Sequence, residues 1–114
     1  MAISFKAIGE RMVTFAAGSG AAAGKVCKIT ANGTVGGCGE GDVFCGVVSQ
    51  VRDGAASVIM AGYVELAYAG DTAPSLGYTA LAADENGEVV PATSGRTYLI
   101  VNVDTASKKI GLFL

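Results

Sequence analysis

Histidine and tryptophan are both absent from this 114-residue sequence. Histidine is the commonest general base and a frequent metal ligand, so its absence excludes Ser-His-Asp triads, Cys-His pairs and histidine-bound metals. Carboxylate or cysteine chemistry would be the remaining routes to catalysis. We therefore expect a protein that is not an enzyme and that has no cofactor or metal site.

Charge is scarce, and no apolar run is long. Charged residues make up 16% of the chain, the net charge is -2, and the eight Lys and Arg residues are dispersed. A nucleic-acid-binding protein usually gathers its cations on one face, so we expect no nucleic-acid partner. No run approaches the roughly 20 apolar residues of a membrane-spanning helix, so we expect no membrane partner. The N-terminus lacks the charged-then-apolar order of a secretory signal, which indicates an intracellular protein.

The chain is instead rich in small apolar residues and glycine. Hydrophobic residues make up 51% of it, and there are 17 glycines. This composition excludes a disordered chain, because enough apolar surface is available for burial on folding. The length predicts one domain with a modest core. We expect an N-terminal arm and Gly/Ala-rich loop over residues 1–24 and a single β domain over residues 25–114.

Three dipeptides mark tight turns between short apolar runs: Asn32-Gly33, Asp53-Gly54 and Asn86-Gly87. Such pairs adopt the positive φ values that two-residue hairpin turns need. Further short strands are indicated near residues 78–82 and 96–103, and "IGLFL" predicts a paired, buried C-terminal strand. No segment shows a convincing helical stripe. The sequence therefore predicts an all-β protein, a small barrel or twisted sandwich of about seven to nine short strands.

The stretch "ASVIMAGYVELAYAG" (55–69) is apolar on both faces of the expected strand. Val58, Met60, Val64 and Leu66 share one face, and the opposite face is also largely apolar. Such a strand is covered on both sides, either by a barrel that closes within the chain or by a neighbouring subunit.

Candidate reactive residues are few. Glu40 and Asp42 lie in the glycine loop "GGCGEGD", where two carboxylates fall short of the six to eight ligands of calcium, so a solvated loop is favoured. Cys27, Cys38 and Cys45 are spaced 11 and 7 residues apart. This spacing fits no CxxC metal site, and free buried thiols are favoured over a disulfide. Cys45 would be a nucleophile only if folding brought a base beside it.

Four tyrosines and one strand carboxylate are candidate ligand-binding groups. The tyrosines are Tyr63, Tyr68, Tyr78 and Tyr98, and the carboxylate is Glu65. Tyrosines that line a groove would indicate a small-ligand or carbohydrate-binding β-barrel module, which is the alternative function. Packing in the core or at an interface is the favoured interpretation of the tyrosines, and an outward position is favoured for the carboxylate.

The order of several segments resembles that of small head proteins of tailed bacteriophages and prophages, regarded as capsid decoration or head-stabilising proteins. These segments are "AAGSGAAAG", "FCGVV", "VIMAGYVELAYAG" and "LGYTALAADENGEVVPA", followed by the closing apolar strand. The resemblance covers about residues 13 to 114. It implies a β-barrel or β-tulip-like body that assembles as a homo-oligomer, commonly a trimer, on the outer face of the head. It also implies the major capsid protein as partner, the virion surface as location and the bacterial cytoplasm as place of synthesis.

The extended N-terminal arm carries our candidate capsid-binding residues, which are Ile3, Phe5, Ile8 and Met12. An extended apolar segment can add a strand to the edge of a sheet, where main-chain hydrogen bonds hold it and side chains enter shallow pockets. The alternative is a frayed terminus without a binding role. The resemblance transfers no catalytic residue to this chain.

Overall fold

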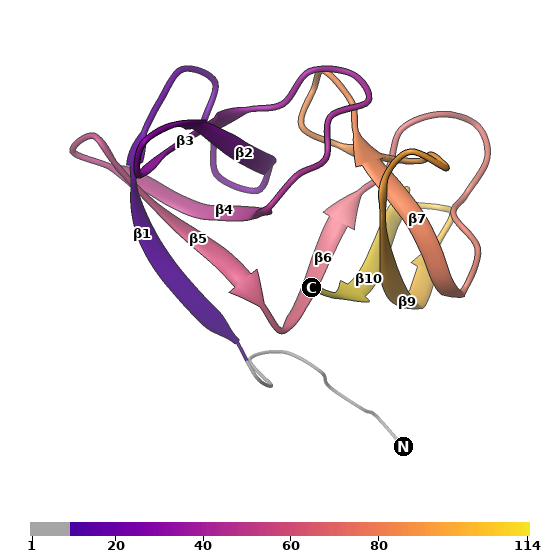
Figure 1. Ribbon diagram of the computed structural model, residues 1–114. Helices are drawn as coiled ribbons and strands as arrows, with labels where there is room; N and C mark the ends of the chain where they lie inside the picture. The colour runs from indigo at the N-terminus through magenta and orange to yellow at the C-terminus, as the bar shows by residue number, and fades with distance from the viewer. Residues whose placement is uncertain (1–9) are drawn as a thin grey trace.

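The computed structural model describes residues 10–114 and confirms the predicted all-β class, with ten strands and no helix among these residues (Figure 1). The strands are β1 (Arg11–Ala17), β2 (Val26–Ala31), β3 (Thr34–Gly37), β4 (Gly46–Arg52), β5 (Ala55–Ala61), β6 (Tyr63–Ala67), β7 (Gly77–Ala83), β8 (Val89–Pro91), β9 (Arg96–Asp104) and β10 (Lys109–Phe113). They form a closed barrel and a separate five-stranded sheet. No helix able to span a membrane occurs in this part of the chain.

The barrel has the strand order β1-β3-β2-β4-β5. Its two hairpins turn at Asn32-Gly33 and at Asp53-Gly54, as predicted. Asp53 and Gly54 have φ values of 53° and 77°, which match the right-handed twist of the flanking strands. The barrel closes because β1 pairs antiparallel with β5 and parallel with β3.

The second sheet has the strand order β6-β10-β9-β7-β8. The C-terminal strand β10 lies between β6 and β9, and its Ile110 and Leu112 are buried, as the apolar ending predicted. Pro91 ends β8 at the outer edge of the sheet, where its missing N–H removes no ladder hydrogen bond.

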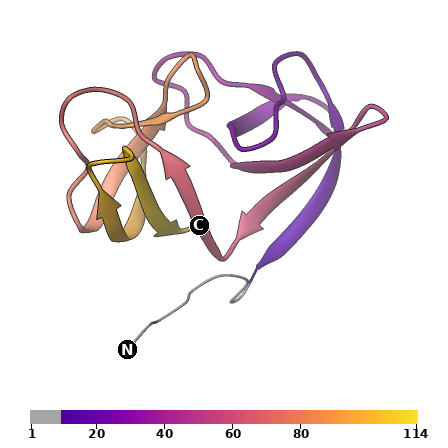
Figure 2. The same cartoon turned by 180° about the vertical axis from the view of Figure 1, so that it is seen from behind.

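The long return strand expected over residues 55–69 is two strands that belong to different sheets. β5 ends at Ala61, Gly62 takes a φ of 102°, and β6 then starts the second sheet. Figure 1 shows the two strands as the arms of a V that joins the barrel to the sheet. The view from behind shows the same arrangement (Figure 2). Both faces of the segment are apolar because β5 and β6 pack into different environments.

Two apolar clusters hold this architecture together. The smaller lies inside the barrel and is formed by Cys27, Val35, Val48, Ala56 and Val58. The larger lies between barrel and sheet and contains Val26, Cys38, Phe44, Val47, Val64, Leu66, Tyr68, Leu81, Ala83, Val89, Tyr98, Ile100, Ile110 and Leu112. Because the larger cluster draws side chains from both bodies, the barrel and the sheet share one core.

The N-terminal region differs from the expected arm and loop in one respect. Arg11–Ala17 form β1, a full barrel strand, and Met12 pairs with Ile59 in it. The pairing is non-local, so the irregular apolar spacing at the start of the chain did not reveal it. Three of the candidate capsid-binding residues, Ile3, Phe5 and Ile8, lie outside the described residues.

Candidate functional site

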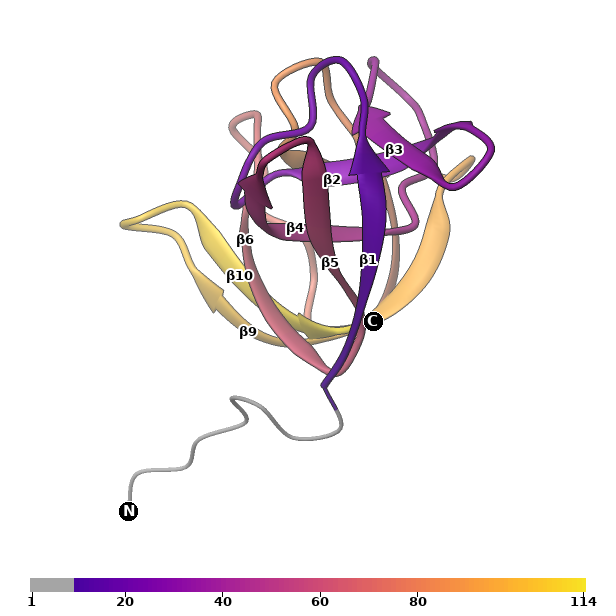
Figure 3. The same cartoon turned by 90° about the vertical axis from the view of Figure 1, so that its left-hand side faces the viewer.

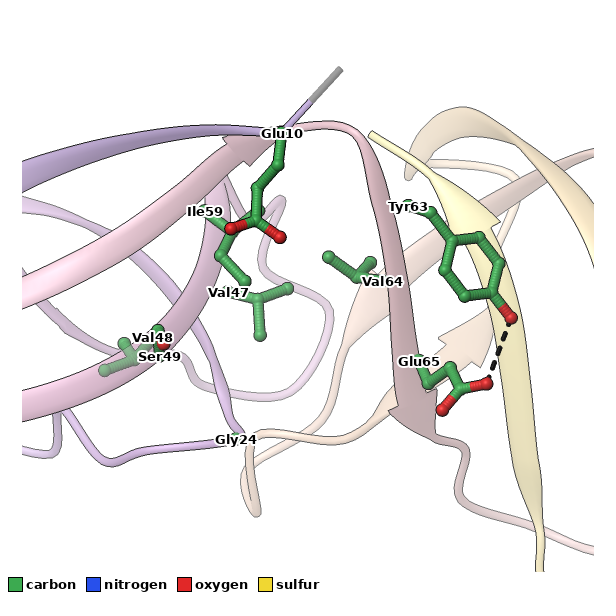
Figure 4. A pocket seen from close by; sticks show the side chains of 9 residues that line it. All are labelled: Glu10, Gly24, Val47, Val48, Ser49, Ile59, Tyr63, Val64 and Glu65. Carbon is green, nitrogen blue, oxygen red and sulfur yellow. Dashed lines mark hydrogen bonds between the residues drawn. The ribbon is translucent and has the colours of Figure 1, made fainter. Parts of the chain in front are cut away.

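A groove with a volume of about 400 Å³ lies between the barrel and the edge of the second sheet (Figure 4). The residues that line it are Glu10, Gly24, Val47, Val48, Ser49, Ile59, Tyr63, Val64 and Glu65. In Figure 4, Val64 of β6 points toward Val47 and Ile59, while Tyr63 and Glu65 project from the other side of β6. The walls are therefore mainly apolar, and β6 forms one of them.

The polar side chains that line the groove are two carboxylates, one phenol and the hydroxyl of Ser49. The Tyr63 hydroxyl donates a hydrogen bond to Oε2 of Glu65 over 3.1 Å. Burial, followed by this carboxylate, raises the pKa of Tyr63, so the phenol stays protonated near neutral pH. Glu10 lies at the opposite wall, and none of the lining residues is Lys or Arg. The groove is suited to binding an apolar chain and offers no base–nucleophile pair.

A row of large side chains crosses the outer face of the second sheet. Tyr63 pairs with Phe113, Phe113 with Leu99, and Leu99 with Tyr78, so the four residues are in register on four strands. Residues next to Tyr63, Phe113 and Leu99 in the chain belong to the larger core cluster. Because side chains alternate between the two faces of a strand, the row lies on the face of the sheet that is turned away from this core. The rings of Tyr63 and Phe113 meet edge to face at 5.6 Å. Tyr63 is 8% exposed, Phe113 and Leu99 are half-buried, and Tyr78 at the other end of the row is 78% exposed.

Other exposed apolar side chains are Met12, Val13, Ile29 and Val51 on the barrel strands and Val43 in the loop before β4. Met12, the one candidate capsid-binding residue within the described chain, is 46% exposed. Scattered apolar side chains are normal on a protein surface, so this set carries less weight than the in-register row.

The three cysteines are free, as predicted, and two of them interact. The Cys45 amide donates to the Cys27 carbonyl over 2.8 Å, although the strand register pairs Cys27 with Gly46. This β-bulge-like arrangement brings the two thiols together. The thiol of Cys27 donates to the Gly46 carbonyl over 3.6 Å. Interaction between the two cysteine side chains raises the pKa of Cys27 and lowers that of Cys45 to about 7. Burial raises the pKa of Cys38 to about 11.

The glycine loop is tied to the barrel by an ion pair that the sequence did not indicate. Lys28 of β2 donates to Oδ2 of Asp42, which also accepts the Gly39 amide over 2.7 Å. The hydrogen bond from Lys28, and to a lesser extent that from the Gly39 amide, lowers the pKa of Asp42. The Asp42 carboxylate in turn raises the pKa of Lys28. The partners are 14 residues apart, so only the folded chain brings them together.

The remaining candidates do not form a chemical centre. Within residues 10–114, no three His, Cys, Asp or Glu side chains are grouped so that they could hold a metal ion. Tyr98 stacks on Phe44 in the core, Tyr68 is buried beside Lys108, and Tyr78 lies on the outer sheet face. Tyr63 is the one tyrosine that lines the groove described above. Glu65 is exposed, as expected for an outward strand residue.

Comparisons with known proteins identify no relative. No protein-family model, no curated protein and no solved structure matches this chain.

Proposed function

We propose that this protein is a non-enzymatic decoration protein of a phage or prophage head, which binds the outer face of the capsid and stabilises contacts between capsid subunits. The observation that carries the proposal is the row Tyr63–Phe113–Leu99–Tyr78 on the outer sheet face. An in-register band of aromatic and aliphatic side chains supports a role in binding another protein surface, because such bands are enriched at interfaces.

In this proposal the row joins copies of the chain into a homo-oligomer, with a trimer as the expected state. The oligomer binds the major capsid protein through the N-terminal residues Ile3, Phe5 and Ile8 and through exposed Met12 of each copy. Three weak attachments in one oligomer reinforce each other, because each bound arm raises the effective concentration of the next. The protein is made in the bacterial cytoplasm and functions on the virion surface.

The oligomer is tested by sedimentation velocity with the full chain and with Tyr78→Ser. We expect a trimer that Tyr78→Ser weakens, because the hydroxymethyl group removes most of the exposed apolar area at the end of the row. Ala106→Ser, in the exposed turn between β9 and β10, is the control and leaves the oligomer unchanged. A full chain that stays monomeric at high concentration contradicts the self-association part of the proposal.

Capsid attachment is tested by co-sedimentation with undecorated capsids of the phage or prophage proposed to encode this chain. We expect saturable binding at fixed stoichiometry and a higher melting temperature of the decorated capsid, because the protein bridges subunits. Capsids that neither bind the chain nor gain stability from it contradict the function. Binding to small ligands or carbohydrates in place of capsids would support the alternative module.

A further inference from the structure

Cys27 and Cys45 face each other across neighbouring strands at a β-bulge. The register pairs Cys27 of β2 with Gly46 of β4, yet the Cys45 amide also donates to the Cys27 carbonyl. Two successive residues of one strand thus oppose one residue of the other. Figure 3 shows β2 and β4 as neighbouring strands of the barrel. Residues that face each other in an antiparallel pair lie about 4.5–5.5 Å apart at Cα, which is within the range that a disulfide spans.

The two thiols also share one apolar environment. Cys27 is fully buried in the smaller cluster inside the barrel, and half-buried Cys45 packs against that cluster. A Cβ at Gly46 would lie 2.6 Å from the Ile59 carbonyl oxygen and 2.7 Å from Cγ1 of Val58, so a side chain does not fit there. The residue directly opposite Cys27 therefore places no side chain between the two sulfur atoms.

Cys38 belongs to a different part of the core. It lies in the larger cluster between the barrel and the sheet, whereas Cys27 lies inside the barrel. Burial raises the pKa of Cys38 to about 11, so its thiol stays protonated and unreactive near neutral pH. Of the three pairs that three cysteines can form, the fold brings together Cys27 and Cys45.

The two members of this pair differ in access and in charge. Cys45 is half-buried, so a small oxidant can reach its sulfur, whereas Cys27 has no exposed surface. Interaction with the Cys27 side chain lowers the pKa of Cys45 to about 7, so that about half of Cys45 is thiolate at neutral pH. Oxidation of cysteine follows thiolate character and exposure, which makes Cys45 the sulfur that reacts first.

We propose that Cys45 is a site of oxidation by peroxides and that Cys27 converts the oxidised sulfur into a Cys27–Cys45 disulfide. In the first step the Cys45 thiolate attacks one oxygen of hydrogen peroxide. An S–O bond forms, the O–O bond breaks, and hydroxide leaves a sulfenic acid on Cys45. In the second step the Cys27 sulfur attacks the Cys45 sulfur. An S–S bond forms, the S–O bond breaks, and the hydroxyl group leaves as water with the thiol proton of Cys27. Two electrons pass from the two sulfurs to the peroxide.

The disulfide closes the segment between the two cysteines into a ring. This segment holds the β2–β3 hairpin and the glycine loop with the Lys28–Asp42 ion pair. Such a ring restricts the unfolded chain and thereby favours the folded one. Cytoplasmic proteins are kept reduced, so the disulfide belongs to protein that has left the cytoplasm. The inference concerns the isolated chain and does not depend on capsid binding.

The test starts from the reduced full chain at neutral pH, which is exposed to hydrogen peroxide and then to N-ethylmaleimide to block the remaining thiols. Trypsin, together with a protease that cleaves after glutamate, separates the three cysteines into peptides 26–28, 29–40 and 41–52. We expect mass spectrometry to find 26–28 joined to 41–52 and dithiothreitol to release the two peptides. Absence of a disulfide, or a main product in which 29–40 is joined to either other peptide, overturns the inference.

Single substitutions test the role of each sulfur. Cys38→Ser is the matched control, because it removes a thiol outside the pair and leaves the yield of the disulfide within about twofold. Cys27→Ser abolishes the disulfide and leaves Cys45 as a sulfenic acid, which dimedone traps. Cys45→Ser abolishes the disulfide without dimedone on Cys27, and it remains informative if Cys27→Ser fails to fold. Dimedone labelling of Cys27 in Cys45→Ser would show that Cys27 is oxidised first and overturns the proposed order.

A mixture of isotope-labelled and unlabelled protein shows whether the disulfide lies within one chain. We expect both joined peptides to carry the same isotope, since the two strands are neighbours in one barrel. Labelled peptides joined to unlabelled ones as the main product show a link between copies and contradict the inference.

Discussion

The ring of Tyr63 lies directly over Gly111 of the neighbouring strand β10. A Cβ at Gly111 would lie 2.0 Å from the Tyr63 hydroxyl oxygen and 2.7 Å from the ring carbon that carries it. Tyr63 thereby spans the outer sheet face, with its hydroxyl on Glu65 and its ring against Phe113. Only glycine at position 111 allows the Tyr63 side chain to come this close to β10. This contact fixes the position of Tyr63 at one end of the row Tyr63–Phe113–Leu99–Tyr78.

Gly111→Ala is expected to lower the free energy of unfolding by about 1–3 kcal/mol, because the tyrosine must leave its rotamer or the strands must shift. Chemical denaturation with urea measures the change. The control is Gly39→Ala, whose added Cβ would make an ordinary contact with Asp42 at 3.4 Å. In the Tyr63→Leu background the Gly111→Ala loss should shrink, since the overlapping phenol is gone. Equal losses in both backgrounds would rule out the steric cause.

The thiol of Cys45 is expected to react with iodoacetamide at a lower pH than an ordinary cysteine. Interaction with the Cys27 side chain lowers its pKa to about 7, and the thiolate is the reactive form. The rate of Cys45 alkylation, followed by mass spectrometry, should therefore rise with pH to a midpoint near 7. Cys27→Ala removes this interaction and should slow the reaction at neutral pH, by about fivefold if the pKa rises from 7 to 8 and by about tenfold for each further unit. Cys38→Ala is the control, and an unchanged profile in Cys27→Ala would disprove that Cys27 lowers the pKa of Cys45.

The Asp42 carboxylate is expected to make the free energy of unfolding decrease as the pH is lowered. Its folded-state pKa lies below the ordinary value of 3.8, mainly because Lys28 donates to it. A lowered carboxyl pKa adds stability above the unfolded-state value, and this stability is lost as the pH falls through the folded-state value. Asp42→Asn should therefore reduce the difference between the free energies of unfolding at about pH 2 and at about pH 6, which thermal unfolding measures. The effect is small because the pair is exposed to solvent. Glu40→Gln, in the same loop, is the control, and a larger effect there would refute the assignment.

Phe44 is expected to be among the residues on which stability depends most strongly. It is 1% exposed, stacks on Tyr98 with ring centroids 5.1 Å apart, and its carbonyl accepts the Tyr98 hydroxyl. Phe44→Ala should cost about 3–5 kcal/mol through the cavity it leaves. Tyr98→Phe keeps the stack and should cost about 0.5–1.5 kcal/mol. Urea unfolding measures both, with exposed Val43→Ala as the control at less than about 0.5 kcal/mol. A Tyr98→Phe loss as large as that of Phe44→Ala would show that the hydrogen bond dominates.

The sequence by itself determined the fold class and the local turns. Asn32-Gly33 and Asp53-Gly54 form hairpins because their preference for positive φ acts within two residues and needs no distant contact. The free state of the three cysteines and the burial of the C-terminal strand were predictable in the same way, from spacing and from apolar character.

Only the tertiary structure decided where the chain changes sheets and which surfaces are candidate binding sites. Gly62 divides an apparently continuous strand, and β1 closes the barrel through partners that lie far along the chain. The pairs Lys28–Asp42 and Cys27–Cys45 meet across strands and loops without any local signal. The groove beside β6 exists because the barrel and the sheet share one core. These features depend on long-range packing, in which many weak contacts act together, whereas a turn dipeptide encodes only its own backbone angles.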